Sequence, residues 1–153
     1  MMIPNLVNPH SSPWAVLPAG IHSASLQEVE SVFASNAKRR RLFAGLKLAC
    51  KALRDAGCTM LFLDGSYVTG KPIPGDYDIC WDPSGVDPSR LDPVFLDFDD
   101  KRSNQKLKYG GEFFPFTWQA EPGKTFLAYF QNDRFTGQPK GIISVDLTCE
   151  PLE

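Results

Sequence analysis

The sequence is poor in the residues that build metal-thiolate sites. It has only two histidines, His10 and His22, and four cysteines, none of which are spaced as C-x-x-C. Structural zinc sites take four Cys or His ligands, usually in closely spaced pairs, so this pattern argues against one. We therefore expect free thiols in a reducing, cytoplasmic environment.

Long apolar runs and a strong charge are also lacking. No apolar stretch approaches the roughly 20 residues of a transmembrane helix, and the first residues lack the basic and apolar segments of a secretory signal. The net charge of -2 gives no general attraction to nucleic acid or to a membrane. We expect neither secretion nor membrane association, and any polyanion must be bound by a local patch.

Length and proline content indicate one domain preceded by an arm. With 153 residues, the chain is long enough for one domain with its own core and short for two. Residues 1–24 contain four prolines and few periodic apolar positions, which predicts an extended N-terminal arm. Residues 25–153 would then form the single domain.

Hydrophobic periodicity predicts helices first and strands later. Ser25 and Glu28 form a capping-box pattern, and residues 36–56 carry apolar side chains at helical spacing up to Gly57. Short apolar runs predict strands at 60–63, 77–81 and 141–147, whereas 125–131 fits either a helix or a strand. This order is typical of an α+β fold, a small mixed α/β sheet flanked by helices.

Asp76, Asp78 and Asp146 carry the strongest chemical signal. Alternate residues of a strand share a face, so Asp76 and Asp78 point the same way while Tyr77 faces the core. Asp146 shares a face with Ser144 on the last predicted strand, where Asp is disfavoured. Clustered carboxylates need cations to neutralise them, and Mg²⁺ prefers oxygen ligands. We expect these three acids to hold Mg²⁺ in a two-metal site for in-line displacement at a triphosphate.

Gly65 and Ser66 directly follow the predicted strand 60–63. A glycine lets the backbone approach a phosphate, and the next residues can begin a helix whose free N–H groups face the anion. Ser66 adds a hydroxyl donor, and Lys71 in the following loop can neutralise phosphate charge. We therefore assign Gly65, Ser66 and Lys71 to nucleotide binding, with a solvated surface charge as the alternative for Lys71.

These motifs resemble those of the polymerase-beta-like nucleotidyltransferase superfamily: a Gly-Ser after a strand, a D-x-D pair on the next strand and an Asp on a later one. The chain looks closest to the minimal, single-domain bacterial members. More narrowly, the segments 17–22, 63–69 and 75–82 resemble an uncharacterised bacterial domain family assigned to that fold, over nearly the whole chain. The resemblance implies the nucleotidyltransferase fold, Mg²⁺ and a nucleoside triphosphate donor, with acceptors that range from proteins to RNA ends and small molecules.

Two departures from that pattern lie around the expected phosphate loop. The residue before the glycine is usually apolar in the minimal enzymes, but Asp64 stands there and adds a negative charge. The stretch from Gly65 to Asp76 is also about one residue tighter than in many minimal members, and it contains Pro72 and Pro74. The phosphate loop therefore matches the family pattern less closely than the three acids do.

Several other charged or aromatic groups have two interpretations. The second D-x-D, Asp97-Phe98-Asp99, lacks an upstream Gly-Ser and is interpreted as surface. Arg102, Lys106 and Lys108 can contact substrate phosphates or be ordinary surface charges. The helix face with Arg40, Lys47, Lys51 and Arg54, next to residues 38–41, can bind RNA or phosphate or be a solvated face. The aromatics of 113–118 can stack on a base or pack in the core.

The motifs favour an enzyme, a cytoplasmic nucleotidyltransferase that moves a nucleoside monophosphate from NTP to an acceptor the sequence does not specify. Larger relatives have a helical second domain that this chain lacks, so the resemblance implies that a protein partner or a second protomer completes the site. A toxin-antitoxin or phage-defence system would suit so small an enzyme. The alternative is a catalytically silent domain of the same fold that binds a protein or RNA, but such a module would not need three acids together.

Overall fold

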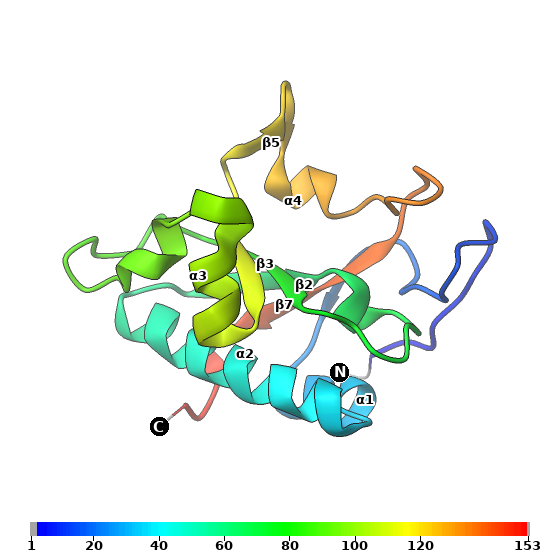
Figure 1. The fold of residues 1–153 in the computed structure, drawn as a ribbon, viewed down its shortest axis with the longest axis horizontal. Coiled ribbons are helices and arrows are strands. Elements are labelled where there is room, and N and C mark those ends of the chain that lie inside the picture. Colours follow the sequence, from blue (N-terminus) through cyan, green and yellow to red (C-terminus); the bar gives the residue numbers. More distant parts are fainter. Residues whose placement is uncertain (1–2, 153) are drawn as a thin grey trace.

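The computed structural model describes residues 3–152 and has an α+β fold built on one mixed five-stranded sheet (Figure 1). In spatial order the strands are β1 (Gly20–Ser23), β7 (Gly141–Asp146), β2 (Met60–Asp64), β3 (Tyr77–Trp81) and β4 (Gly111–Pro115). β2 is antiparallel to β7 and to β3, whereas β1 is parallel to β7 and β4 is parallel to β3. The amino ends of four strands therefore meet the carboxyl end of β2 at one end of the sheet.

Helices cover one face of this sheet and enclose the main core. α1 (Leu26–Phe33) and α2 (Ala37–Asp55) lie beneath the sheet in Figure 1 and pack on buried residues such as Leu61, Ile79 and Val145. α3 (Asp99–Tyr109) packs against α2 and β4. Alternation along the strands sends every second side chain to this face.

The opposite face is covered by smaller elements. The hairpin of β5 (Gln119–Glu121) and β6 (Lys124–Thr125) and the short α4 (Phe126–Tyr129) rise above it in Figure 1. A second apolar cluster forms here around Phe62, Cys80 and Ile142 of the sheet and Phe130 after α4. The polar residues of this face, beyond that cluster, form the candidate site.

The predicted helices and strands are confirmed within a residue or two. At the start of α1, the Glu28 backbone N–H donates to Ser25 Oγ and the Ser25 N–H donates to the Glu28 carboxylate, which is the predicted capping box. α2 begins after the Asn36 cap, and Gly57 follows its end with a φ of +105°. Residues 125–131 resolve in favour of a helix, α4, capped by Thr125.

Three elements had no clear sequence signal. β1 lies inside the predicted arm and pairs with β7 over its whole length, so the sheet begins before residue 25. α3 and β4 come from the basic and aromatic stretches. They are tied together by Gln105, which is fully buried, accepts from the Phe113 N–H and donates to the Phe113 carbonyl. Because β4 is an edge strand, this side chain also blocks further strand pairing at Phe113.

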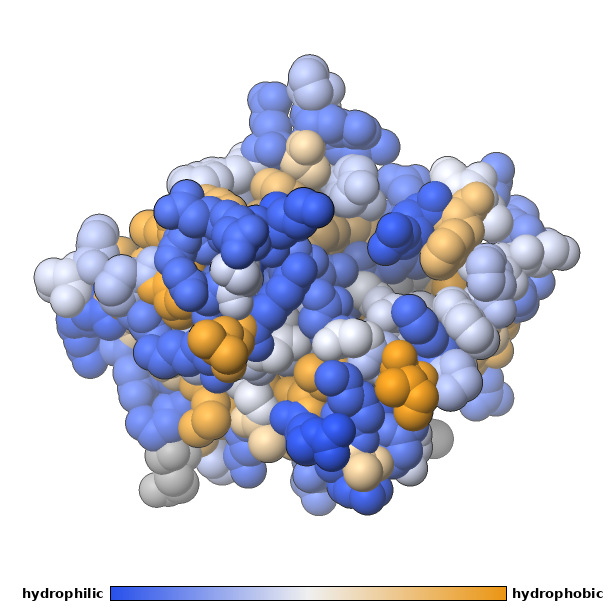
Figure 2. Space-filling model, in the orientation of Figure 1, coloured by the Kyte–Doolittle hydropathy of each residue, from blue (hydrophilic) through white to orange (hydrophobic). Residues whose placement is uncertain are grey.

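Polar residues dominate the face of the molecule shown in Figure 2, most densely over α3, and the apolar patches are small and scattered. Among residues 3–152, no helix combines the length and apolarity that crossing a bilayer requires.

Candidate metal centre

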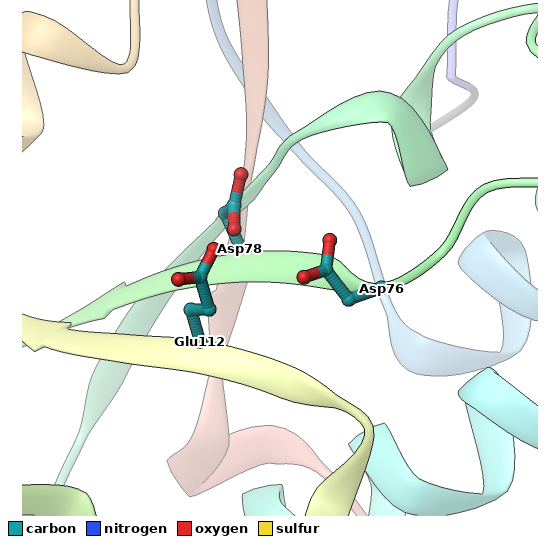
Figure 3. Close-up of side chains that lie close together, drawn as sticks. All are labelled: Asp76, Asp78 and Glu112. Carbon is teal, nitrogen blue, oxygen red and sulfur yellow. The ribbon is translucent and has the colours of Figure 1, made fainter. Parts of the chain in front are cut away.

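Three carboxylates come together where β3 and β4 begin. Asp76 immediately precedes β3, Asp78 is its second residue, and Glu112 lies beside Asp78 on β4. One carboxylate oxygen from each lies within 4.8 Å of the others. Figure 3 shows the three side chains on the same side of the two strands. Three oxygen donors at this spacing fit a hard divalent cation such as Mg²⁺.

Gly65 follows the carboxyl end of β2 and lies beside Asp78. Gly65 has a φ of +86° and a ψ of -174°, a conformation that is essentially restricted to glycine. A Cβ atom at this position would lie 2.7 Å from Asp78 Oδ2. The predicted Gly-Ser motif and the Asp pair are thus in direct contact. Ser66 opens the 3₁₀ turn η1 (Ser66–Val68), whose first N–H groups have no acceptor inside the turn.

Asp78 is the acid of the group whose charged form is least favourable. Burial raises its pKa well above the ordinary value, and the charges of Asp64, Asp76 and Glu112 raise it further. Among the residues that the structure describes, its buried Oδ1 atom has no hydrogen-bond partner. A buried carboxylate oxygen without a partner is costly, and a bound cation would remove that cost.

Asp76 lies nearer the solvent than Asp78, and three lysines influence its charge. Burial raises its pKa, with a contribution from Glu112, but Lys106, Lys71 and Lys38 act in the opposite direction. These lysines come from α3, from the loop after η1 and from the first turn of α2. An acidic centre that feels the charge of lysines from three segments suits a ligand that combines a metal ion with an anion.

Asp64, the unexpected acid before the glycine, has an internal counterion. It is buried and forms an ion pair with Lys140, the residue before β7. Burial raises the pKa of Asp64, and the Lys140 ammonium opposes this. The negative charge that seemed unfavourable beside a phosphate site is therefore compensated within the protein.

The structure does not bring Asp146 to the other predicted acids, and this corrects the expected three-aspartate cluster. Met60, at the start of β2, pairs with Asp146, whereas Asp64 at its end pairs with Asp78. Asp146 shares the predicted face but lies at the opposite end of the sheet, because β7 is parallel to β3 and Asp146 is its last residue. There Asp146 caps η3 (Leu147–Cys149) by accepting from the backbone N–H and hydroxyl of Thr148.

Glu112 takes the third position. A single acid in an aromatic stretch gave no obvious signal, although the alternation of Glu112 and Phe114 with buried Phe113 is that of a strand. Arg102 of α3 donates a hydrogen bond from Nε to Glu112 Oε1 at 2.7 Å, and its Nη2 forms an ion pair with the same oxygen at 2.6 Å. Lys106 Nζ lies 3.8 Å from the same oxygen.

The remaining candidates lie elsewhere. Lys108 pairs with Asp92, away from the acids, at 2.5 Å. Asp97 accepts from the N–H of Asp99 just before α3, in agreement with a surface role for that second D-x-D. Phe113 is part of the main core, as the packing interpretation expected, whereas Trp118 is 48% exposed.

The basic face of α2 divides into three groups. Arg39 turns into the protein and is buried. Lys51 and Arg54 both contact Asp55. Arg40 and Lys47 remain exposed, so they are the members of this face that are available to a partner.

The comparisons with known proteins place the chain in a family. Residues 9–146 of the 153 match the model described as "Family of unknown function (DUF6932)". The chain belongs to this family. No curated protein and no solved structure matches it. The match includes every acid of the candidate centre, and it begins within the predicted arm, before β1.

Proposed function

We propose that this member of the DUF6932 family is a Mg²⁺-dependent nucleotidyltransferase that transfers a nucleoside monophosphate from NTP to a protein, an RNA end or a small molecule. The observation that carries the proposal is the cluster of Asp76, Asp78 and Glu112, with carboxylate oxygens within 4.8 Å of one another. The buried Asp78 Oδ1 supports it, because this oxygen has no hydrogen-bond partner among residues 3–152.

Each neighbouring element has a role in this proposal. Gly65 allows the backbone to pass close to Asp78, and Ser66 begins a turn whose first N–H groups have no acceptor inside the turn. Lys71, Lys106 and Lys38 would hold the triphosphate at the rim. A bound Mg²⁺ would activate the acceptor hydroxyl and stabilise the leaving pyrophosphate.

Asp76 is partly exposed and Lys106 is exposed, so a partner can reach this side of the centre. A second protomer or a protein partner at this rim would provide the surface that grips the base or the acceptor, as proposed for a toxin-antitoxin or phage-defence setting. The competing function is a silent domain that binds a protein or RNA through exposed cations such as Arg40 and Lys47.

The test is transfer of label from NTP. Wild-type protein is incubated with labelled ATP, CTP, GTP or UTP, Mg²⁺ and a cell extract, beside Asp76→Ala and the matched surface variant Asp99→Ala. We expect label on an acceptor with wild type and Asp99→Ala, and none with Asp76→Ala or with excess EDTA. If wild type transfers no label and binds no Mg²⁺–NTP, the enzymatic proposal fails and the silent domain is favoured.

The stabilisation by Mg²⁺ should depend on pH. The raised pKa of folded Asp78 means that the folded state holds this proton more tightly than the unfolded state, whose Asp pKa is about 3.9. In the metal-free protein, this contribution to stability is present below about pH 4 and is lost as pH rises through the folded-state pKa. Mg²⁺ binds the ionised acid, so it should raise the melting temperature more at about pH 8 than at about pH 5. Scanning fluorimetry at matched ionic strength measures this, and an equal rise at both pH values would contradict it.

A further inference from the structure

The acids of the candidate centre belong to a longer row of charges that crosses the sheet. Asp64 on β2, Asp78 on β3 and Glu112 on β4 are successive register partners, and Asp76 lies two residues before Asp78. Two cations stand at the ends of this row. Lys140, just before β7, contacts Asp64, and Arg102 of α3 contacts Glu112.

The inner end of the row is a closed ion pair. Lys140 is 7% exposed and Asp64 is 5% exposed. A buried charge is strongly unfavourable unless it keeps its partner, so the Asp64 and Lys140 side chains hold each other in place. Asp64 is therefore not free to bind a metal ion, although it lies directly beside Asp78.

The outer end is also occupied, but more loosely. The Arg102 side chain is 33% exposed and the Glu112 side chain 16%. Both Arg102 contacts, the hydrogen bond from Nε and the ion pair from Nη2, go to one oxygen of Glu112, Oε1, so Glu112 can still offer its other oxygen. Of the lysines near Asp76, Lys106 is exposed and Lys38 and Lys71 are partly exposed, so solvent screens their charges.

The contacts along the row leave one set of ligands for a divalent cation. Lys140 occupies Asp64, whereas Arg102 and Lys106 approach one oxygen of Glu112, Oε1. Among the residues that the structure describes, Asp78 forms no ion pair, and its buried Oδ1 has no hydrogen-bond partner. We infer that the nucleotide-free protein binds a single divalent cation, at Asp76, Asp78 and Glu112, and that the Lys140 ammonium supplies the charge a second metal would otherwise provide. A second ion then enters only with the triphosphate. This inference rests on the proposed function.

The number of bound Mn²⁺ ions tests it directly. Electron paramagnetic resonance titration without nucleotide should show one Mn²⁺ per wild-type chain. Lys140→Gln removes the cation that occupies Asp64, so Asp64 and Asp78 can hold a second ion and the variant should bind two. The double variant Asp64→Asn/Lys140→Gln restores the wild-type charge and should return to one. Lys140→Arg, which keeps the charge, should also bind one.

The outcomes separate this inference from the proposed function. Wild type that binds no Mn²⁺ overturns both. Wild type that binds two overturns only the inference, and this count needs no variant. One Mn²⁺ in both wild type and folded Lys140→Gln would show that Lys140 does not set the number. If circular dichroism shows that Lys140→Gln is unfolded, the test is the double variant Asp64→Asn/Lys140→Gln. Two Mn²⁺ ions bound to that variant would contradict the inference.

Discussion

Asp78→Asn is expected to abolish Mg²⁺ binding and to lower nucleotidyl transfer by about a thousandfold or more, since metal stabilisation of a transition state supplies several kcal/mol and each 1.36 kcal/mol is a tenfold change in rate. The same substitution should stabilise the metal-free protein. Asp78 is buried beside three other acids, and an amide of the same shape removes the charge while donating a hydrogen bond towards Glu112. A gain of ~1 kcal/mol would raise the melting temperature by about 2–4 °C.

Asp146→Asn is the matched control for this prediction. It makes the same chemical change on the same face of the sheet, but at the opposite end, where Asp146 caps η3 at the surface. Transfer activity and the rise in melting temperature with Mg²⁺ should both match wild type. Loss of activity in Asp146→Asn with retention in Asp78→Asn would show that the catalytic centre lies elsewhere.

The D-x-D pair and its strand could be predicted because they depend on local pattern. Tyr77, Ile79 and Trp81 alternate with polar or small residues, and their burial fixes the face to which Asp78 points. The position of Asp146 could not be predicted in this way. Alternation of apolar and polar residues predicts which face of a strand each side chain lies on. The direction of the strand and its neighbours in the sheet depend on the topology of the whole chain. β7 joins the sheet parallel to β3, which sends Asp146 to the far end and brings Lys140 to the acids.

Glu112 and Lys140 show a second limit of sequence reasoning. Each is a single charged residue next to the start of a strand, and neither belongs to a spaced motif. Their roles arise from contacts across the sheet: Glu112 with Asp78 of the neighbouring strand, and Lys140 with Asp64 from 76 positions earlier. The sequence shows that Asp64 is an unusual residue before the glycine, but only the structure shows that Lys140 compensates its charge.

The phosphate loop depends on a residue that looked like part of a basic surface. Arg39 of α2 is buried and donates four hydrogen bonds to backbone carbonyls. One goes to Phe33 at the end of α1, and the others go to Tyr67 at 2.6 Å, Thr69 at 2.9 Å and Lys71 at 2.6 Å. Its guanidinium thus fixes three carbonyl groups within the segment that follows Gly65. Only a planar group with five donors can reach all four acceptors.

Arg39→Lys should therefore loosen this loop even though it keeps the charge. An ammonium group cannot reach all four carbonyls, and each buried acceptor left unpaired costs about 1–3 kcal/mol. We expect the melting temperature to fall by roughly 5–10 °C, on the basis of ~2–4 °C per kcal/mol. Amide hydrogen exchange should become faster in residues 66–72, and Mg²⁺–NTP affinity should fall by about tenfold if loop order contributes about 1.4 kcal/mol to binding.

Arg40→Lys provides the comparison, because Arg40 is the next residue of the same helix and is exposed. It should leave the melting temperature, the exchange rates and nucleotide affinity unchanged. The decisive measurement is the affinity for Mn²⁺ without nucleotide, because Asp78 and Glu112 are positioned by β3 and β4 and Asp76 immediately precedes β3. Arg39→Lys should keep that affinity and lose Mg²⁺–NTP binding. Equal loss of both would mean that Arg39 supports the whole fold rather than the orientation of the phosphate loop.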